Sequence, residues 1–96
     1  MHVISKKKLR TFWSIHPEAE SSLNNWFRVA KKAEWMTFAD LHATFRSADQ
    51  VGKYTVFNIG GNKYRLIAEI NYRSGKVFLR YVLTHADYSR GTWKKT

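Results

Sequence analysis

Apolar residues recur three and four positions apart in the first half of the chain and then at every second position. The first spacing predicts a helix over residues 6–15, with Ser5 in the position of its N-terminal cap. A second helix is predicted from Pro17 to Lys32, because proline ends one helix and suits the first turn of the next. A Thr-x-x-Asp capping box at residues 37–40 predicts a short third helix.

A period of two, typical of half-buried strands, begins at Tyr54 and is lost by residue 84. The tail beyond it has no periodicity, and no element is predicted there. Helices followed by hairpin-linked strands predict an α+β fold, in which a twisted, mainly antiparallel sheet is packed on one face by N-terminal helices. The length predicts a single domain over residues 1–96. The predicted strands are residues 2–5, 55–59, 63–72 and 76–83.

Alternation along the last two strands assigns their side chains to two faces of the predicted sheet. The second face mixes apolar residues with the cations Lys63, Arg65 and Arg80. Such a half-open face fits a phosphate-binding groove, and the alternative is a solvated surface that keeps the protein soluble. The first face is apolar or aromatic and is expected to face the helices, through Tyr64, Leu66, Ala68, Ile70, Tyr72, Val77, Leu79, Tyr81 and Leu83.

The charge balance points to the kind of partner. Lys and Arg number 17 against 7 Asp and Glu, which gives a formal net charge of +10. This excess predicts a polyanionic partner, with nucleic acid first and an anionic membrane surface or an acidic protein next. Residues 49–96 carry the larger share of the excess and are the better candidate for the contact surface. The acids are scattered without metal-ligand spacing, so we predict no metal and no cofactor.

Three further features narrow the class of protein. The absence of cysteine excludes disulfides, thiol catalysis and cysteine zinc sites. No apolar run approaches the ~18 residues that a membrane span needs. The lysines at 6–8 follow a very short apolar piece, which is the reverse of a signal peptide. We therefore expect a cytoplasmic protein without a membrane partner.

Candidate chemistry also lies just beyond the last predicted strand. His85 stands there near the basic face, where a histidine can act as a general acid or base. Tyr88 can stack on a base or hold a proton. The alternative is a capping turn, with Thr84 or Asp87 as the cap and Tyr88 as rim packing. Trp93 lies in a basic tail and is a candidate stacking residue or partner anchor.

Two stretches, residues 56–66 (VFNIGGNKYRL) and residues 84–88 (THADY), resemble the HigB family of toxins, in the RelE superfamily of type II toxin–antitoxin systems. The resemblance implies a RelE-like α+β domain and a metal-independent endoribonuclease that cleaves mRNA, usually in the ribosomal A site. It also implies a neutralising helix-turn-helix antitoxin, with operator DNA bound only by the toxin–antitoxin complex. A non-catalytic RNA- or ribosome-binding module is the alternative.

The residues that match the family pattern suggest roles in such a cleavage. Arg65 is the candidate for stabilising the charge that develops on the phosphate, and His85 and Tyr88 are candidates for proton transfer and positioning. Which of these two acts as the base stays open. The residues predicted to bind RNA are Lys63, Arg80, Asn58, Lys53 and Arg73.

Overall fold

A five-stranded sheet with the strand order β1-β5-β4-β3-β2 organises the computed structural model, which describes residues 1–95. The pairs are antiparallel except for β1 and β5, which run parallel, so the predicted α+β class is confirmed. The strands are β1 (His2–Ile4), β2 (Asp49–Val51), β3 (Tyr54–Ile59), β4 (Tyr64–Asn71) and β5 (Lys76–Thr84). The helices are α1 (Lys6–Ile15), α2 (Glu20–Lys32), α3 (Phe38–Thr44) and α4 (His85–Arg90), with 3₁₀ turns η1 (Pro17–Ala19) and η2 (Thr92–Lys95).

The helix boundaries follow local signals in the sequence. Pro17 opens η1 directly after α1, as predicted. Ser5 stands at the N-cap of α1, but its backbone is left-handed (φ 78°) and its hydroxyl caps nothing, because side-chain capping needs an extended N-cap residue. At α3 the predicted N-cap forms, because the Thr37 hydroxyl accepts from the Asp40 N–H. The Asp40 carboxylate reaches back as in a capping box but accepts from the N–H of Met36, one residue before the cap.

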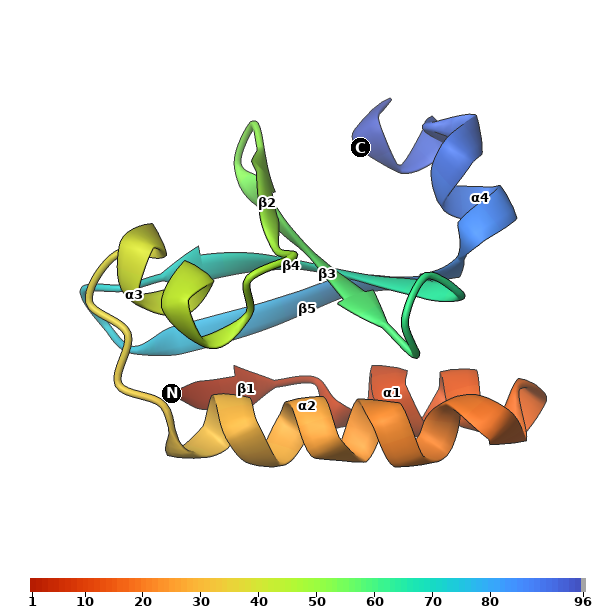
Figure 1. Ribbon diagram of the computed structural model, residues 1–96, viewed down its shortest axis with the longest axis horizontal. Coiled ribbons are helices and arrows are strands. Elements are labelled where there is room, and N and C mark those ends of the chain that lie inside the picture. The colour runs from red at the N-terminus through yellow and green to blue at the C-terminus, as the bar shows by residue number, and fades with distance from the viewer. Residues whose placement is uncertain (96) are drawn as a thin grey trace.

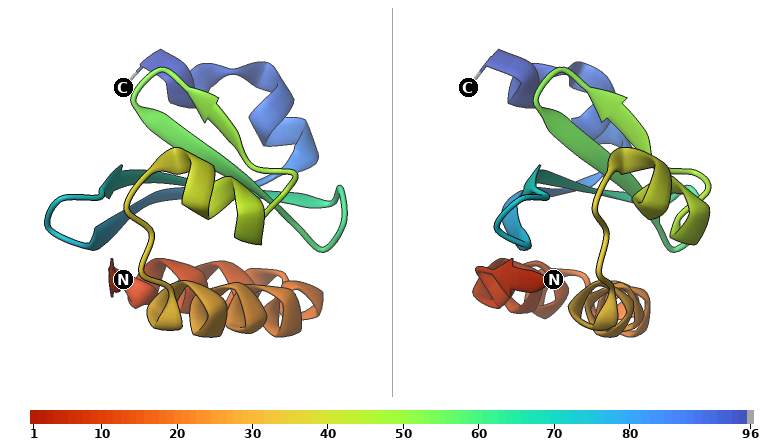
Figure 2. Two further views of the ribbon diagram at one scale, coloured as in Figure 1. Left: turned by 60° about the vertical axis from the view of Figure 1, so that its left-hand side comes forward. Right: turned by 90° about the vertical axis from the view of Figure 1, so that its left-hand side faces the viewer.

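The main core lies between the sheet and the helices α1 and α2. Both views in Figure 2 place these two helices side by side on one side of the sheet, with α4 on the other side. The apolar stripe of α2 and the inward residues of β4 meet there, and Leu41 of α3 closes the core near β3. The largest fully buried members of this core are Trp26, Phe57, Leu9, Leu23, Leu41, Leu66 and Leu79.

The opposite face of the sheet, which we call the outer face, carries a second and smaller core. The C-terminal segment folds back over this face as α4 and η2 (Figure 1). Trp93 is only 4% exposed there, packed with Tyr54, Val56 and Ile67. The expectation of a tail without elements is therefore wrong, and Trp93 anchors the chain to itself and not to a partner. The outer face comprises Tyr54, Val56, Asn58, Arg65, Ile67, Glu69, Phe78, Arg80, Tyr81 and Leu83.

A β-bulge at Arg80 changes the orientation of the end of β5. Tyr81 pairs with Ile67 and Leu79 with Ala68, so Arg80 is an extra residue on its strand. Beyond the bulge the alternation reverses, and Tyr81 and Leu83 pack against the outer core. The prediction that these two side chains face the helices is therefore wrong.

The strand β2, at the edge of the sheet beside β3, lies in a stretch for which no element was expected. Within residues 1–95, no helix combines the length and the apolar character that crossing a membrane requires.

Candidate active site on the outer face

Arg65 is the most constrained cation of the outer face. It stands at the start of β4 and is only 8% exposed. Its guanidinium donates to the Tyr64 carbonyl at 3.1 Å, to the Asn62 carbonyl at 3.3 Å and to the Asn62 side-chain oxygen. Because a guanidinium has five N–H groups, these three bonds do not exhaust its donors. The turn before β4 therefore fixes a planar cation that can still bind a phosphate oxygen.

Tyr88 of α4 lies over this guanidinium. The guanidinium carbon of Arg65 is 5.3 Å from the centroid of the Tyr88 ring. The ring stacks on Trp93, with centroids 5.4 Å apart and planes inclined by 16°, and the Trp93 indole N–H donates to the Tyr88 carbonyl at 3.1 Å. The Thr84 hydroxyl accepts from the Asp87 N–H and caps the helix. The structure thus brings together two of the predicted catalytic residues, Arg65 and Tyr88.

His85 is the first residue of α4, one helical turn before Tyr88. Its backbone N–H donates to the Lys63 carbonyl at 3.0 Å, which ties the start of α4 to the turn before β4. Its ring is exposed, with Nδ1 3.5 Å from the Ser89 hydroxyl. Lys63 is also exposed and lies in the turn, one residue before the strand on which it was expected. His85 and Lys63 thus border the end of the sheet at which Arg65 lies.

Asn58 completes this end of the outer face. It pairs with Arg65 in the register of β3 and β4, so the two side chains share a face. Its side chain is exposed. The cavity of about 380 Å³ that it borders runs from the turn at Gly60 and Gly61 to α2, on the helix side of the sheet, and does not include Arg65. Both glycines have positive φ, which places glycine where other residues would be strained. Asn58 is therefore accessible to a ligand beside Arg65.

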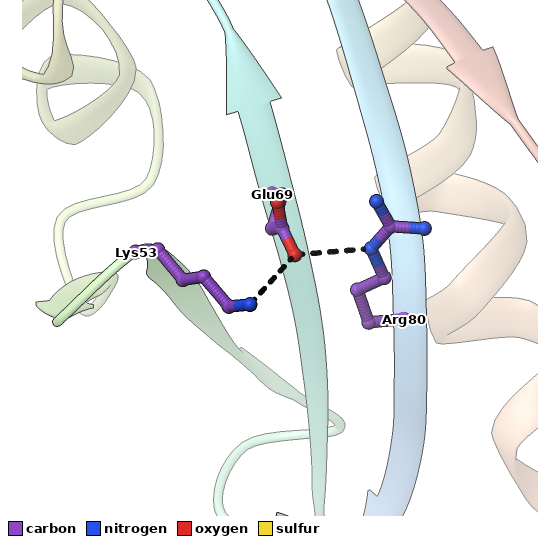
Figure 3. Close-up of polar contacts among 3 residues, drawn as sticks. All are labelled: Lys53, Glu69 and Arg80. Carbon is purple, nitrogen blue, oxygen red and sulfur yellow. Dashed lines mark hydrogen bonds and ion pairs between the residues drawn. The ribbon is translucent and has the colours of Figure 1, made fainter. Parts of the chain in front are cut away.

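The remaining predicted RNA-binding residues form a second group at the other end of the outer face. Lys53, in the turn between β2 and β3, and Arg80, at the bulge, approach the Glu69 carboxylate from its two sides, at 3.8 Å and 3.3 Å (Figure 3). Arg73, in the turn between β4 and β5, borders with Arg80 a cavity of about 460 Å³. Two cations thus share one carboxylate, which leaves a net positive charge.

The two groups are separate on the sheet. Arg65 and Glu69 are four residues apart on β4, which corresponds to about 13 Å. Ile67, Tyr81 and Trp93 occupy the space between them as part of the outer core. The expected single cluster of Lys63, Arg65 and Arg80 is therefore not formed: Arg65 and Arg80 share a face but lie toward opposite ends of it.

Sequence reasoning missed two residues that shape these groups. Asn62 accepts hydrogen bonds from the Arg65 guanidinium at both its carbonyl and its side-chain oxygen. In the sequence, its position in a Gly-Gly-Asn turn indicated only a role in the turn. Glu69 is the carboxylate that orders Lys53 and Arg80. Its signal was present, because strand alternation places Glu69 on the same face as Arg65.

A polar contact at the same end of the sheet joins the helices to β4. The Tyr64 hydroxyl donates to the Glu18 carboxylate, whose other near neighbour is His16 Nδ1 at 3.7 Å. This hydrogen bond is the largest cause of a lowered pKa of Glu18, and a backbone hydrogen bond lowers that pKa further, as do the neighbouring His16 and Lys63 to a smaller extent. The bond between Tyr64 and Glu18, together with burial, raises the pKa of Tyr64. This contact holds the start of β4 against η1.

Comparison with known proteins places this geometry in a family. A family model described as the HigB toxin, the RelE-like toxic component of a toxin–antitoxin system, matches residues 19–91. The chain belongs to the HigB toxin family. The match includes every element that carries the outer face, from β3 to α4. As the toxic component of such a system, a HigB-family chain has an antitoxin as its partner.

Curated relatives agree with the HigB family. The chain is 30% identical over 95 residues to the mRNA interferase HigB of Escherichia coli O6:H1 (strain CFT073), which covers 96% of this chain and 92% of the relative. It is 32% identical over 91 residues to the mRNA interferase toxin HigB of Escherichia coli (strain K12), which covers 92% and 88%. The likeness extends over nearly the whole of both proteins.

Proposed function

We propose that this HigB-family toxin is an endoribonuclease that cleaves mRNA without a metal ion and so inhibits translation. The names of its relatives, mRNA interferases, support the substrate and the reaction. The observation that carries the proposal on this chain is the buried Arg65 guanidinium, held by a turn and covered by the ring of Tyr88. A cation fixed in this way is prearranged for charge that develops on a phosphate.

The reaction that suits these groups is attack of a ribose 2′-oxygen on the adjacent phosphorus. The 2′-hydroxyl loses its proton to a base, the P–O5′ bond breaks, and the leaving 5′-oxygen takes a proton from an acid. The products are a 2′,3′-cyclic phosphate and a 5′-hydroxyl. Arg65 stabilises the charge on the phosphate oxygens, and His85 and Tyr88 share the two proton transfers.

The other predicted residues hold the RNA on either side of the reacting phosphate. Lys63 and Asn58, which border Arg65, bind the nucleotides next to the cleaved bond. Lys53, Arg80 and Arg73 lie at the far end of the outer face and bind the backbone about 13 Å away. The domain over residues 1–96 would thus carry both cleavage and binding.

The wider setting is part of the same proposal. The net charge of +10 suits a ribosome-associated enzyme that meets its mRNA on a polyanionic surface in the cytoplasm. The antitoxin would be a helix-turn-helix protein, and the complex of the two chains would bind operator DNA. The resemblance of residues 56–66 and 84–88 to the family supports these assignments.

Induced expression combined with RNA analysis tests the function. We expect growth arrest, together with cleaved mRNA in translation extracts. Arg65→Ala and His85→Ala should relieve the arrest, and Arg28→Ala, which removes an exposed arginine on α2, should not. Arrest with intact RNA and strongly salt-dependent binding would instead identify a non-catalytic RNA- or ribosome-binding module.

A further inference from the structure

The edge of β5 is open over most of its length. The short strand β1 pairs only with Lys76, Val77 and Phe78, and then the chain turns at Ser5 into α1. Residues 79–84 of β5 have no strand beside them on this side within the described chain. This open stretch is about 20 Å long. Protein edges of this kind are usually shielded, because their free N–H and C=O groups pair with another strand.

A groove runs along this open edge. Figure 1 shows α1 following β1 along the same side of β5, and a cavity of about 530 Å³ lies between α1 and the strand. Ile15 of α1 and Val82 and Leu83 of β5 give the groove apolar walls. Ile15 is 71% exposed, which is unusual for a large aliphatic side chain in the absence of a partner. Backbone groups and apolar walls together suit a polypeptide better than a nucleic acid.

The rim of the groove is basic. Lys7 and Lys8 line it from α1, and Arg80 lines it from β5. No acidic residue precedes Glu18 in the chain, and neither lysine takes part in an ion pair among the described residues. Lysines in the first turn of a helix are disfavoured by its dipole, so the folded chain alone gives no reason for them. Acidic side chains on a bound partner would supply that reason.

We propose that the groove between α1 and β5 receives an extended, acidic segment of the antitoxin, which adds a strand to the sheet along residues 79–84 of β5. Main-chain hydrogen bonds to β5 give this interaction its affinity. On the face of the segment that turns toward α1, an apolar side chain packs beside Ile15, and acidic side chains farther along the segment face Lys7 and Lys8. The proposal deepens the proposed function by naming how the partner of this toxin docks.

The position of the edge explains how such docking would neutralise the site. Leu83 pairs with Arg65 across β5 and β4, and His85 follows the strand after one residue. An added strand would lie two strand spacings from Arg65, or about 10 Å. Acidic side chains on its outer face would repel RNA from the end of the sheet at which Arg65, His85 and Lys63 lie.

The antitoxin for this test is expressed from the neighbouring reading frame and is first shown to relieve toxicity. Its binding to two matched pairs of variants then tests the proposal. Ile15→Asp should weaken binding at least about tenfold, whereas Met36→Asp, at an equally exposed residue outside the groove, should leave it unchanged. Lys7→Glu with Lys8→Glu should weaken binding, and Lys31→Glu with Lys32→Glu, on α2, should not. In hydrogen–deuterium exchange, the antitoxin should slow the amides of residues 79–84.

Several outcomes would overturn it. Antitoxin binding that survives both groove variants, or amides at 79–84 that exchange equally fast in the complex, would place the partner elsewhere. Loss of RNA binding alone in the Lys7 and Lys8 variant would make the groove an RNA surface. A dimer of the free chain that Ile15→Asp dissociates would make the occupant a second copy. Because antitoxin binding is measured apart from cleavage, a chain that cleaves no RNA can still bear out the docking site.

Discussion

The guanidinium carbon of Arg65 and the ring centroid of Tyr88 lie 5.3 Å apart. This contact joins the start of β4 to a helix that follows β5, so it exists only because the C-terminal segment folds back over the sheet. Cation–π contacts of this kind gain strength where water is excluded, and Arg65 is largely buried. The placement of the proposed catalytic cation therefore depends on both the turn at Asn62 and the docking of α4.

Replacement of Arg65 by lysine keeps the charge but removes the planar fork. We expect Arg65→Lys to lower kcat for RNA cleavage by about 10²-fold, the cost of losing one prearranged donor to a developing negative charge. Single-turnover cleavage of a defined mRNA measures this. Arg28→Lys on α2 is the matched control and should cleave as the parent does. A cleavage rate in Arg65→Lys equal to that of the parent would remove Arg65 from the mechanism.

Two variants of Tyr88 separate its hydroxyl from its ring. Tyr88→Phe keeps the stack on Trp93 and the contact with Arg65, so a cleavage loss of about 10²-fold would come from proton transfer by the hydroxyl. Tyr88→Ala also removes the ring and should lower the stability of the folded chain. If Tyr88→Phe cleaves at the parental rate while His85→Ala does not, the proton transfers belong to His85 and Tyr88 only positions Arg65.

The order of elements from β1 to β5, apart from β2, could be predicted because the longer helices and strands are marked by local periodicity. The stripe of α2 and the alternation of β4 need no knowledge of the rest of the chain. The helix α4 has six residues, none of them buried, and is held by Thr84 and Trp93. Its one local signal was the Thr84-x-x-Asp87 spacing, the same capping box that correctly predicted α3.

The candidate site could be predicted only in part, because it depends on how the strands are aligned. Alternation correctly placed Arg65 and Glu69 on one face of β4. The bulge at Arg80 has no signature in an apolar strand, yet it reverses every side chain after it. The short edge strand β2 has exposed polar residues at Asp49 and Gln50, so its pattern resembled a loop.

Trp93 should contribute most of the stability of the outer core. Its indole is buried against Tyr54 and Tyr88, so Trp93→Ala should lower the free energy of unfolding by about 3–5 kcal/mol. Urea unfolding measures the change. Trp93→Phe keeps an aromatic ring and should cost less. Because α4 is held through this residue, Trp93→Ala should also slow RNA cleavage, and an unaffected rate would show that α4 is dispensable.

Glu69 should lower the affinity of the outer face for RNA. Its carboxylate lies 3.8 Å from Lys53 and 3.3 Å from Arg80, so Glu69→Gln removes a negative charge that competes with phosphate. We expect tighter RNA binding and a steeper fall of affinity with salt. Filter binding over a salt series measures both quantities. Glu34→Gln, at an exposed acid beyond the end of α2, is the control, and an identical salt slope in the two variants would exclude Lys53 and Arg80 from the interface.

The hydrogen bond from Tyr64 to Glu18 should make stability depend on pH in both directions. It lowers the pKa of Glu18, so the stabilisation is present above the usual carboxyl range and is lost as the pH falls through the lowered value. It also raises the pKa of Tyr64, so the stabilisation is present below pH 10.0 and is lost as the pH rises through the raised value. The stability difference between the parent and Tyr64→Phe should therefore be largest near neutral pH and shrink at acid pH.

Unfolding measured by urea at several pH values, together with an NMR titration of the Glu18 carboxyl, checks this dependence. In Tyr64→Phe the pKa of Glu18 should rise toward its ordinary value, because the bond from Tyr64 is the largest cause of its lowering. Glu18→Gln supplies the control, since it removes the titrating carboxylate and should flatten the acid limb of the profile. Because Phe keeps the ring contact with Phe12, a difference between parent and Tyr64→Phe that is constant from neutral to acid pH would mean that the contribution of the hydroxyl does not depend on the charge of Glu18.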